Sequence, residues 1–294
     1  MADGADRSTV VVPGIDALRP EHGRLFVAVG VFDGLHLGHL YLLRHLREAA
    51  AARGARPAVI TFDHHPDEIL TGAAPALLCD PDERLALLAR AGIEVTVVQH
   101  FDVALRMTSH EEFIGRIAAG VDLAGFLMTP DSAFGHERRG TPEAVAALGT
   151  TMGYDVVTVP PLDLEGRPVR SAEIREDIAA GDLAGATALL GRPYAVVGER
   201  MMGAVDRVHL AFPMPVALPP AGAYPTVVGH RLNGDGEPGV PATVTVLADG
   251  RLDIEAEAVA SIADHRLRVT FVGAGSGSAG RLPDPDDAGN IRRS

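Results

Sequence analysis

The feature that most constrains the fold is an alternation between strand-length apolar runs and longer helix-like segments, from residue 26 to about residue 190. The predicted strands are residues 26–32, 55–62, 94–99, 123–128 and 155–159. Periodic apolar patterns between them predict helices over residues 38–53, 81–91, 110–119 and 142–152. Strands that alternate with helices form a parallel sheet covered on both faces. The sequence therefore predicts an α/β domain whose ligands bind at the carboxyl ends of the strands.

The pattern changes after GRPY, residues 191–194. Residues 194–272 hold short β-like runs and many Gly and Pro residues, which predicts a smaller β-barrel-like domain. The polar, low-complexity end of the chain is predicted to be disordered. The predicted organisation is an N-terminal extension, an α/β domain, a β domain and a tail, over residues 1–23, 24–190, 191–272 and 273–294.

Charge and cysteine content exclude several classes of function. The net charge of −13 argues against broad nucleic-acid binding, which needs a basic face. The single cysteine, Cys79, allows no intramolecular disulfide and disfavours a Cys-based zinc site. No apolar run reaches the roughly 18 residues of a membrane span, and the first residues lack a signal-peptide pattern. A cytoplasmic protein without nucleic-acid or membrane partners is expected. The sequence does not indicate an oligomeric state.

The stretch GVFDGLHLGH, residues 30–39, follows a predicted strand and leads into a predicted helix. Its glycines allow tight turns and a close approach of the backbone. The start of a helix offers unpaired N–H groups and a partial positive charge, which suit a phosphate. His36 and His39 are three residues apart, so both side chains fall on one helical face. From the spacing alone, two interpretations of the histidine pair stay open: the side chains contact a phosphate, or they are two surface histidines beside a turn.

The same stretch resembles the HxGH signature of the nucleotidyltransferase superfamily, in the longer form GxFDGxHxGH. Four further blocks resemble, in order, those of the prokaryotic FAD synthetase family, the bifunctional riboflavin kinase/FMN adenylyltransferases. These blocks are residues 61–66 (TFDHHP), 82–102, 129–141 (TPDSAFGHERRGT) and 166–194. The resemblance is good over residues 24–195 and weaker to about residue 272.

The resemblance implies a Rossmann-like nucleotidyltransferase domain that transfers AMP from ATP, with Mg²⁺, to FMN, giving FAD and pyrophosphate. It implies catalytic roles at the ATP phosphates for His36, His39 and Arg175. The implied ATP-binding residues are Gly30, Phe32, Asp33, Gly34, Gly38, Ser171 and Arg175. The implied flavin-binding residues are Phe62, Asp63, His65, Asp131, Phe134 and Arg138. Asp33 has a second interpretation as a turn cap, because Asp before Gly at a strand end often has that role.

The chain departs from the family pattern at three places. Ala172 replaces the Thr of the SST-x-I-R block, and Ser132-Ala133 leaves one aromatic in the flavin loop where the family has two. In the β domain, Met214 and Val216 stand where a riboflavin kinase needs the Thr and Asn of PTAN. Neither side chain can bind a hard cation, which prefers oxygen ligands. We therefore expect a degenerate kinase module, although Glu255 aligns with the catalytic Glu.

Three other functions stay open at this stage: a nucleotidyltransferase for another phosphorylated substrate such as a flavin analogue, a non-catalytic flavin or nucleotide sensor, and a still bifunctional enzyme. No metal site is expected. His64 and His65 lie beside Asp63, but adjacent side chains of an extended strand point in opposite directions. They cannot chelate one ion together unless the strand has already ended.

Overall fold

The structure is a computed structural model that describes residues 9–201, 206–230 and 239–272. The chain divides into two compact units. The first contains residues 1–32, 39–75 and 85–162, and the second contains residues 33–38, 76–84 and 163–294. The predicted disordered tail, residues 273–294, lies outside the described residues.

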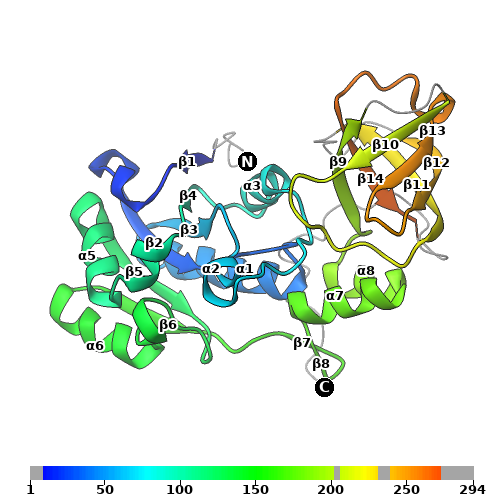
Figure 1. Cartoon of the computed structure of the whole chain (residues 1–294). Coiled ribbons are helices and arrows are strands. Elements are labelled where there is room, and N and C mark those ends of the chain that lie inside the picture. Colours follow the sequence, from blue (N-terminus) through cyan, green and yellow to red (C-terminus); the bar gives the residue numbers. More distant parts are fainter. Residues whose placement is uncertain (1–8, 202–205, 231–238, 273–294) are drawn as a thin grey trace, which may run out of the picture. The chain divides into compact units, whose positions relative to one another are not determined.

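The first unit is built on a six-stranded parallel sheet with the order β1-β4-β3-β2-β5-β6 (Figure 1). Its strands are β1 (Val10–Val12), β2 (Arg24–Val29), β3 (Arg56–Phe62), β4 (Val95–Gln99), β5 (Asp122–Met128) and β6 (Asp155–Thr158). Every pairing in the sheet is parallel. The predicted α/β fold with a parallel sheet is therefore confirmed. β1 falls in the predicted N-terminal extension, where a three-residue strand gives no readable pattern.

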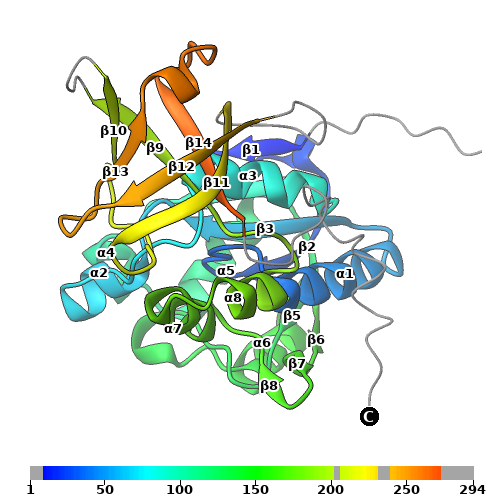
Figure 2. The same cartoon turned by 90° about the vertical axis from the view of Figure 1, so that its right-hand side faces the viewer.

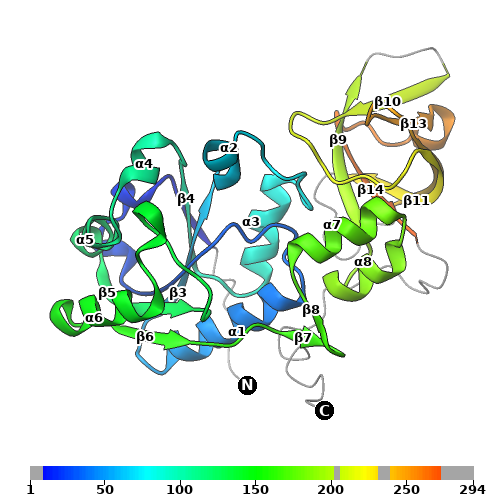
Figure 3. The same cartoon turned by 60° about the horizontal axis from the view of Figure 1, so that its bottom comes forward.

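Six helices connect these strands or extend from them. They are α1 (Leu37–Ala51), α2 (Pro66–Thr71), α3 (Pro81–Arg90), α4 (Val103–Met107), α5 (His110–Gly120) and α6 (Pro142–Met152). The four predicted helices are confirmed to within about two residues, whereas the short α2 and α4 were not predicted. The connections through α1 and α5 run across the sheet in opposite directions, so the two helices cover opposite faces, with α6 beside α5 (Figure 3).

Burial and capping explain why these segments fold as they do. Six of the seven residues of β3 are buried, as expected for a strand covered on both faces. Ser109 and Thr141 cap α5 and α6 by accepting backbone N–H groups of Glu112 and Ala144, at 3.2 and 3.3 Å. The predicted strand over residues 26–32 extends too far. β2 ends at Val29, because the next residues turn sharply toward α1.

The second unit contains a closed antiparallel barrel with the order β10-β13-β12-β11-β14-β9, which confirms the predicted β-barrel-like domain (Figure 2). Its strands are β9 (Ala195–Met201), β10 (Arg207–Ala211), β11 (Gly222–His230), β12 (Val240–Val246), β13 (Leu252–Glu255) and β14 (Arg266–Phe271). Alternating residues of these strands, among them Val244, Leu252 and Val269, are fully buried and fill the interior.

The second unit also contains a hairpin and two helices that precede the barrel. These are β7 (Asp163–Leu164), β8 (Arg167–Pro168), α7 (Ser171–Ala180) and α8 (Leu183–Leu190). The sequence analysis placed the domain boundary after residue 190, whereas the structure groups residues 163–190 with the barrel. Among the described residues, none of the helices combines the length and apolar character needed to cross a lipid bilayer.

Candidate functional site

The turn between β2 and α1 has an unusual backbone. Phe32, Gly34 and Leu35 have positive φ values of 53°, 79° and 33°. A side chain in this region is strained, so the surrounding contacts must hold it in place. Phe32 and Leu35 are both buried, which anchors the turn on either side of Gly34. The predicted phosphate-binding stretch is thus a constrained loop.

A buried carboxylate, that of Asp33, organises this turn. Asp33 is only 3% exposed, and it accepts backbone N–H groups of Leu78 and Cys79 at 2.9 and 3.3 Å. Its second oxygen lies 2.5 Å from an Nη atom of Arg175. Through these contacts the Asp33 side chain connects to Leu78, which is 45 positions further along the chain, and to Arg175, which is 142 positions further. They favour the structural interpretation of Asp33 over direct contact with ATP.

The first turns of α7 complete this arrangement. Ser171 begins α7, and its hydroxyl donates to the carbonyl of Asp33 at 3.1 Å. Arg175 lies one turn later, and its Nε donates to the carbonyl of Ala76 at 2.7 Å. The structure therefore brings together Asp33, Ser171 and Arg175, three of the residues expected near ATP. Ala172, the departure from the family pattern, is exposed in the same turn of α7.

Gly38 is required by packing at the start of α1. A Cβ atom at this position would lie 2.6 Å from the carbonyl oxygen of Val169 and 3.1 Å from the ring of His36. Only glycine fits, as the sequence analysis expected for a close backbone approach. Arg192, the arginine of GRPY, holds the turn from another direction by donating to the carbonyls of Gly34 and Leu35, at 2.7 and 3.1 Å.

The two motif histidines lie at the start of α1. His36 directly precedes the helix and is 4% exposed, and His39 lies in the first helical turn. The ring of His39 packs on Phe32, with 5.1 Å between ring centroids. The backbone N–H groups of a first helical turn have no partner within the helix, and they carry partial positive charge. An anionic group bound here would therefore meet these N–H groups as well as the imidazoles.

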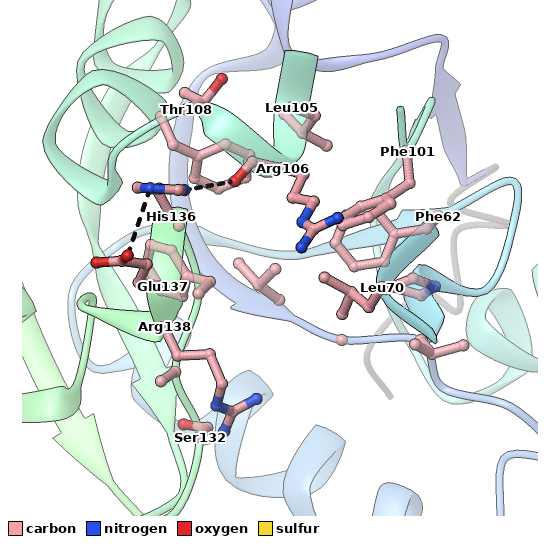
Figure 4. Close-up of a pocket in the computed structure, with 18 of the residues that line it drawn as sticks. Phe62, Leu70, Phe101, Leu105, Arg106, Thr108, Ser132, His136, Glu137 and Arg138 are labelled. Atoms are coloured by element: carbon pink, nitrogen blue, oxygen red, sulfur yellow. Dashed lines mark hydrogen bonds and ion pairs between the residues drawn. The ribbon is translucent and has the colours of Figure 1, made fainter. Parts of the chain in front are cut away.

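A pocket of the first unit opens at the carboxyl edge of its sheet and has a volume of about 660 Å³ (Figure 4). This volume is within the range of small-molecule sites. The pocket wall is rich in aromatic side chains, namely Phe62, Phe101, Phe113, Phe126 and Phe134. Phe62 and Phe101 meet edge to face at 5.4 Å. A flat, largely apolar ring system suits such a pocket.

Polar groups enter this pocket at two places. Arg106 and Arg138 both line it; the Arg106 guanidinium lies in the middle of the view and that of Arg138 lies beside Ser132 (Figure 4). Arg106 also donates to the carbonyl of Ile69 at 3.3 Å, and Arg138 donates to the carbonyl of Asp131 at 3.1 Å. His136 completes the polar rim and lies 3.4 Å from the Arg106 carbonyl. A ligand with an aromatic body and an anionic end would be complementary to this set.

Four of the six residues predicted to bind flavin line this pocket: Phe62, His65, Phe134 and Arg138. Within the described part of the chain, Asp63 and Asp131 do not line it. Gly30, predicted on the ATP side, also lies in the pocket wall. Several lining residues were missed by the sequence analysis, namely Phe101, Arg106, Phe113, Phe126 and His136. Of these, only Phe101 and His136 stood in a recognised sequence block.

The altered loop over residues 129–141 is closed by its own hydrogen bonds. The Ser132 hydroxyl donates to the Thr129 carbonyl at 2.8 Å and accepts the Thr129 N–H at 3.0 Å. Phe134, the aromatic that remains, packs against Phe113 and Phe126, with centroid distances of 5.5 and 5.8 Å. Ser132 therefore stabilises a turn at the place where the family pattern has an aromatic ring.

Asp63 lies just outside this pocket and is held by several donors. Burial raises its pKa, but hydrogen bonds from His100, the Phe101 N–H and His64 outweigh that effect and leave the pKa below its ordinary value. The hydrogen bond to Asp63, at 2.6 Å, in turn raises the pKa of His100. His100 was not singled out by the sequence analysis, because it is 37 residues away from Asp63.

The motif offers few ligands for a Mg²⁺ ion held by the protein itself. Asp33 is its only carboxylate, and that carboxylate is already engaged by Arg175 and two backbone N–H groups. An additional cation beside Arg175 would meet positive charge. The residues present therefore fit a substrate that brings Mg²⁺ with its own phosphates better than they fit a resident metal ion.

Three comparisons relate the chain to known proteins. A family model described as FAD synthetase matches residues 18–173. A bifunctional riboflavin kinase/FMN adenylyltransferase from Pseudomonas fluorescens is 31% identical over an aligned length of 281 residues, and the alignment covers 89% of this chain and 88% of that protein. A protein of the same description from Haemophilus influenzae is 32% identical over 179 residues, 60% of this chain and 58% of its own length.

A solved structure described as a macrolide-efflux protein from Streptococcus pneumoniae resembles the chain with a TM-score of 0.73 and 21% identity, and it covers 97% of this chain and 96% of its own. A similarity at this level of identity shows a shared fold alone.

Proposed function

This chain belongs to the FAD synthetase family of nucleotidyltransferases, and we propose that it transfers AMP from MgATP to FMN, giving FAD and pyrophosphate. The observation that supports this most strongly is the intact GVFDGLHLGH turn, fixed by Asp33, Gly38 and Arg192. The aromatic pocket of the first unit adds to it, because its rings and two guanidinium groups match a flavin with a terminal phosphate.

The proposed chemistry needs no covalent enzyme intermediate. A phosphate oxygen of FMN attacks the α-phosphorus of ATP, the bond to the β-phosphate breaks, and pyrophosphate leaves. His36 and His39, with the N–H groups of the first α1 turn, stabilise the negative charge that develops at the α-phosphate. We assign Arg175 to the β- and γ-phosphates. MgATP is the substrate, and its ion neutralises the leaving pyrophosphate.

The test is a product assay with purified protein, MgATP and FMN, separated by chromatography. The proposal predicts that FAD and pyrophosphate form in equal amounts. If FMN is recovered unchanged while a phosphorylated flavin analogue is adenylylated, the reaction class stands and the substrate assignment is wrong. If neither compound is adenylylated but both bind, the chain is a sensor.

The flavin pocket gives a prediction for binding. Phe101→Ala is expected to raise KM for FMN by about 3- to 10-fold with little change in kcat, since an aromatic contact contributes about 0.5–1.5 kcal/mol beyond its buried area. Steady-state kinetics with each substrate varied in turn measures this. Val103→Ala is the matched control, because Val103 begins the neighbouring α4 and is 62% exposed. An equal rise in KM for ATP, or an unchanged KM for FMN, would contradict the pocket assignment.

We also propose that the barrel has lost riboflavin kinase activity. Met214 and Val216 offer no oxygen ligand, and their segment pairs with Leu77, whose N–H donates to the Pro215 carbonyl at 2.8 Å. The pocket beside them has a volume of about 190 Å³, below the usual range for a ligand site. Within the described residues Glu255 does not line that pocket, and its carboxylate lies 3.8 Å from Arg207.

The kinase proposal predicts that MgATP and riboflavin yield no FMN and no FAD. The same preparation must convert FMN to FAD, so that an inactive sample is recognised. The double variant Met214→Thr/Val216→Asn tests whether two ligands alone restore phosphorylation, and we expect that they do not, because the pocket is too small. Formation of FMN from riboflavin by the unmodified protein would show a bifunctional enzyme.

A further inference from the structure

We propose that Asp63, His64 and His100 form a binding site for a divalent transition-metal ion of the Zn²⁺ type. Each of the three residues offers one ligand atom, and these atoms all lie within 4.8 Å of one another. The site is separate from the MgATP chemistry proposed above and does not depend on it.

The parallel sheet brings the three residues together. β3 and β4 are neighbours, and Phe62 at the end of β3 is paired in register with Gln99 at the end of β4. Asp63 and His100 are the next residue on each strand, and the Asp63 N–H continues the ladder by donating to the Gln99 carbonyl at 3.2 Å. The sequence analysis considered His64 with His65, its neighbour, whereas the structure pairs His64 with a residue from the adjacent strand.

His65 is directed elsewhere. Its ring accepts the N–H of Asp67 at 3.2 Å as the N-cap of α2, and the side chain lines the aromatic pocket. β3 ends at Phe62, so Asp63, His64 and His65 lie beyond the strand, and the adjacent Asp63 and His64 can face one ion. The His64 side chain is 47% exposed, and its ring centroid lies 5.9 Å from that of His100, with 83° between the two ring planes.

The carboxylate of Asp63 is already oriented. One oxygen accepts the backbone N–H groups of His64 and Phe101 at 2.8 and 3.1 Å. The same oxygen lies 3.2 Å from Nδ1 of His64, and the other lies 2.6 Å from Nδ1 of His100. Backbone donors to a ligating carboxylate fix its direction, as outer-shell contacts do in known metal sites. Ligands about 2.0–2.1 Å from a tetrahedral Zn²⁺ stand roughly 3.3 Å apart, so the two imidazoles need only small rotations.

The donor set selects the kind of ion. Two imidazole nitrogens and one carboxylate oxygen are typical zinc ligands, with water in the fourth position. Mg²⁺ prefers an all-oxygen octahedron and would gain little here. His100 is 63% exposed, so an ion can reach the site from solvent.

The position of the site suggests its effect. A bound ion would join the loop after β3 to the loop after β4, and the flanking residues Phe62 and Phe101 form one aromatic wall of the pocket. We therefore expect the ion to stabilise the fold of these loops.

Titration calorimetry with ZnCl₂ on the chelator-treated full-length protein tests the proposal. We expect one strong equivalent of Zn²⁺ that a large excess of Mg²⁺ does not displace. His64→Ala and His100→Ala should each weaken it by roughly tenfold or more. His265→Ala is the matched control, an exposed histidine beside Asp264 in the barrel unit, and it should retain full affinity.

Thermal unfolding with and without Zn²⁺ is a second test of the site. Because ligands stabilise the state that binds them, Zn²⁺ should raise the Tm of the unmodified protein and of His265→Ala, and should raise that of His100→Ala less. His64 and His100 are both exposed, so these variants should keep the metal-free Tm. Equal affinity and stoichiometry in all four proteins, or no strong equivalent in the unmodified protein, would overturn the proposal.

Discussion

Replacing His39 with asparagine is expected to lower the kcat for FAD formation by about 100- to 1,000-fold, the usual effect of losing one preorganised donor to a developing oxyanion. KM for ATP should change little, because the lost interaction is strongest in the transition state. Asparagine is polar, but it cannot carry a positive charge and has no donor where the far ring nitrogen of histidine, Nε2, stands. His36→Asn should have an effect of the same order, since both imidazoles are assigned to the α-phosphate.

His45→Asn is the control for this experiment. His45 lies further along α1, beside Glu48 at 3.2 Å and Tyr41 at 4.6 Å between ring centroids. Its substitution should leave kcat within about twofold of the unmodified enzyme, because the half-buried side chain contacts Glu48 and Tyr41 and not the motif. Circular dichroism and the Tm of each variant separate loss of chemistry from loss of structure. A near-normal kcat of the His39→Asn variant would show that this histidine does not act in the catalytic step.

Asp33→Ala should reduce the free energy of unfolding by about 3–5 kcal/mol, because it removes one member of a buried ion pair and leaves its partner uncompensated. Two backbone N–H groups, those of Leu78 and Cys79, would lose their acceptor as well. The turn that presents the motif would lose its anchor, so FAD formation should fall with stability. Urea unfolding of the full-length protein measures the change.

An ion pair on the surface provides the comparison for this loss in the free energy of unfolding. Asp16 meets Arg116 through two contacts, at 2.9 and 2.5 Å, but the Asp16 side chain is 71% exposed. Asp16→Ala should therefore cost only about 0–1 kcal/mol. Arg175→Met should show strong coupling with Asp33→Ala in a double-mutant cycle. Equal costs for Asp33→Ala and Asp16→Ala would mean that Asp33 does not organise the turn.

The sheet of this protein could be predicted from its sequence because the apolar patterns of its strands and of the helices that cover it are both regular. Buried strands such as β3 appear as continuous apolar runs, and α5 and α6 show amphipathic spacing behind a Ser or Thr cap. The motif histidines could be located because a glycine-rich turn between strand and helix is a local pattern. Gly38 was expected at a close approach, and the structure supplies the opposing atom, the Val169 carbonyl.

The remaining features depend on contacts between distant residues. Nothing in the sequence indicates that Asp33 pairs with Arg175, 142 positions later. His100 could be connected to Asp63 only once β3 and β4 were known to be neighbours. β1, α2 and α4 have three, six and five residues, too few for a period to emerge. The pocket aromatics Phe113 and Phe126 look like ordinary core residues in the sequence, because each side chain both packs in the core and lines the pocket.

The most direct test of the central claim follows the phosphate groups of ATP. Purified protein is incubated with FMN and MgATP labelled either at the α-phosphate or at the γ-phosphate. Adenylyl transfer predicts that the α-label appears in FAD and the γ-label in pyrophosphate, with no label in FMN itself. An unlabelled flavin fraction with α-labelled ATP, at enzyme concentrations comparable to those of the substrates, would contradict the assignment of this chain as an FMN adenylyltransferase.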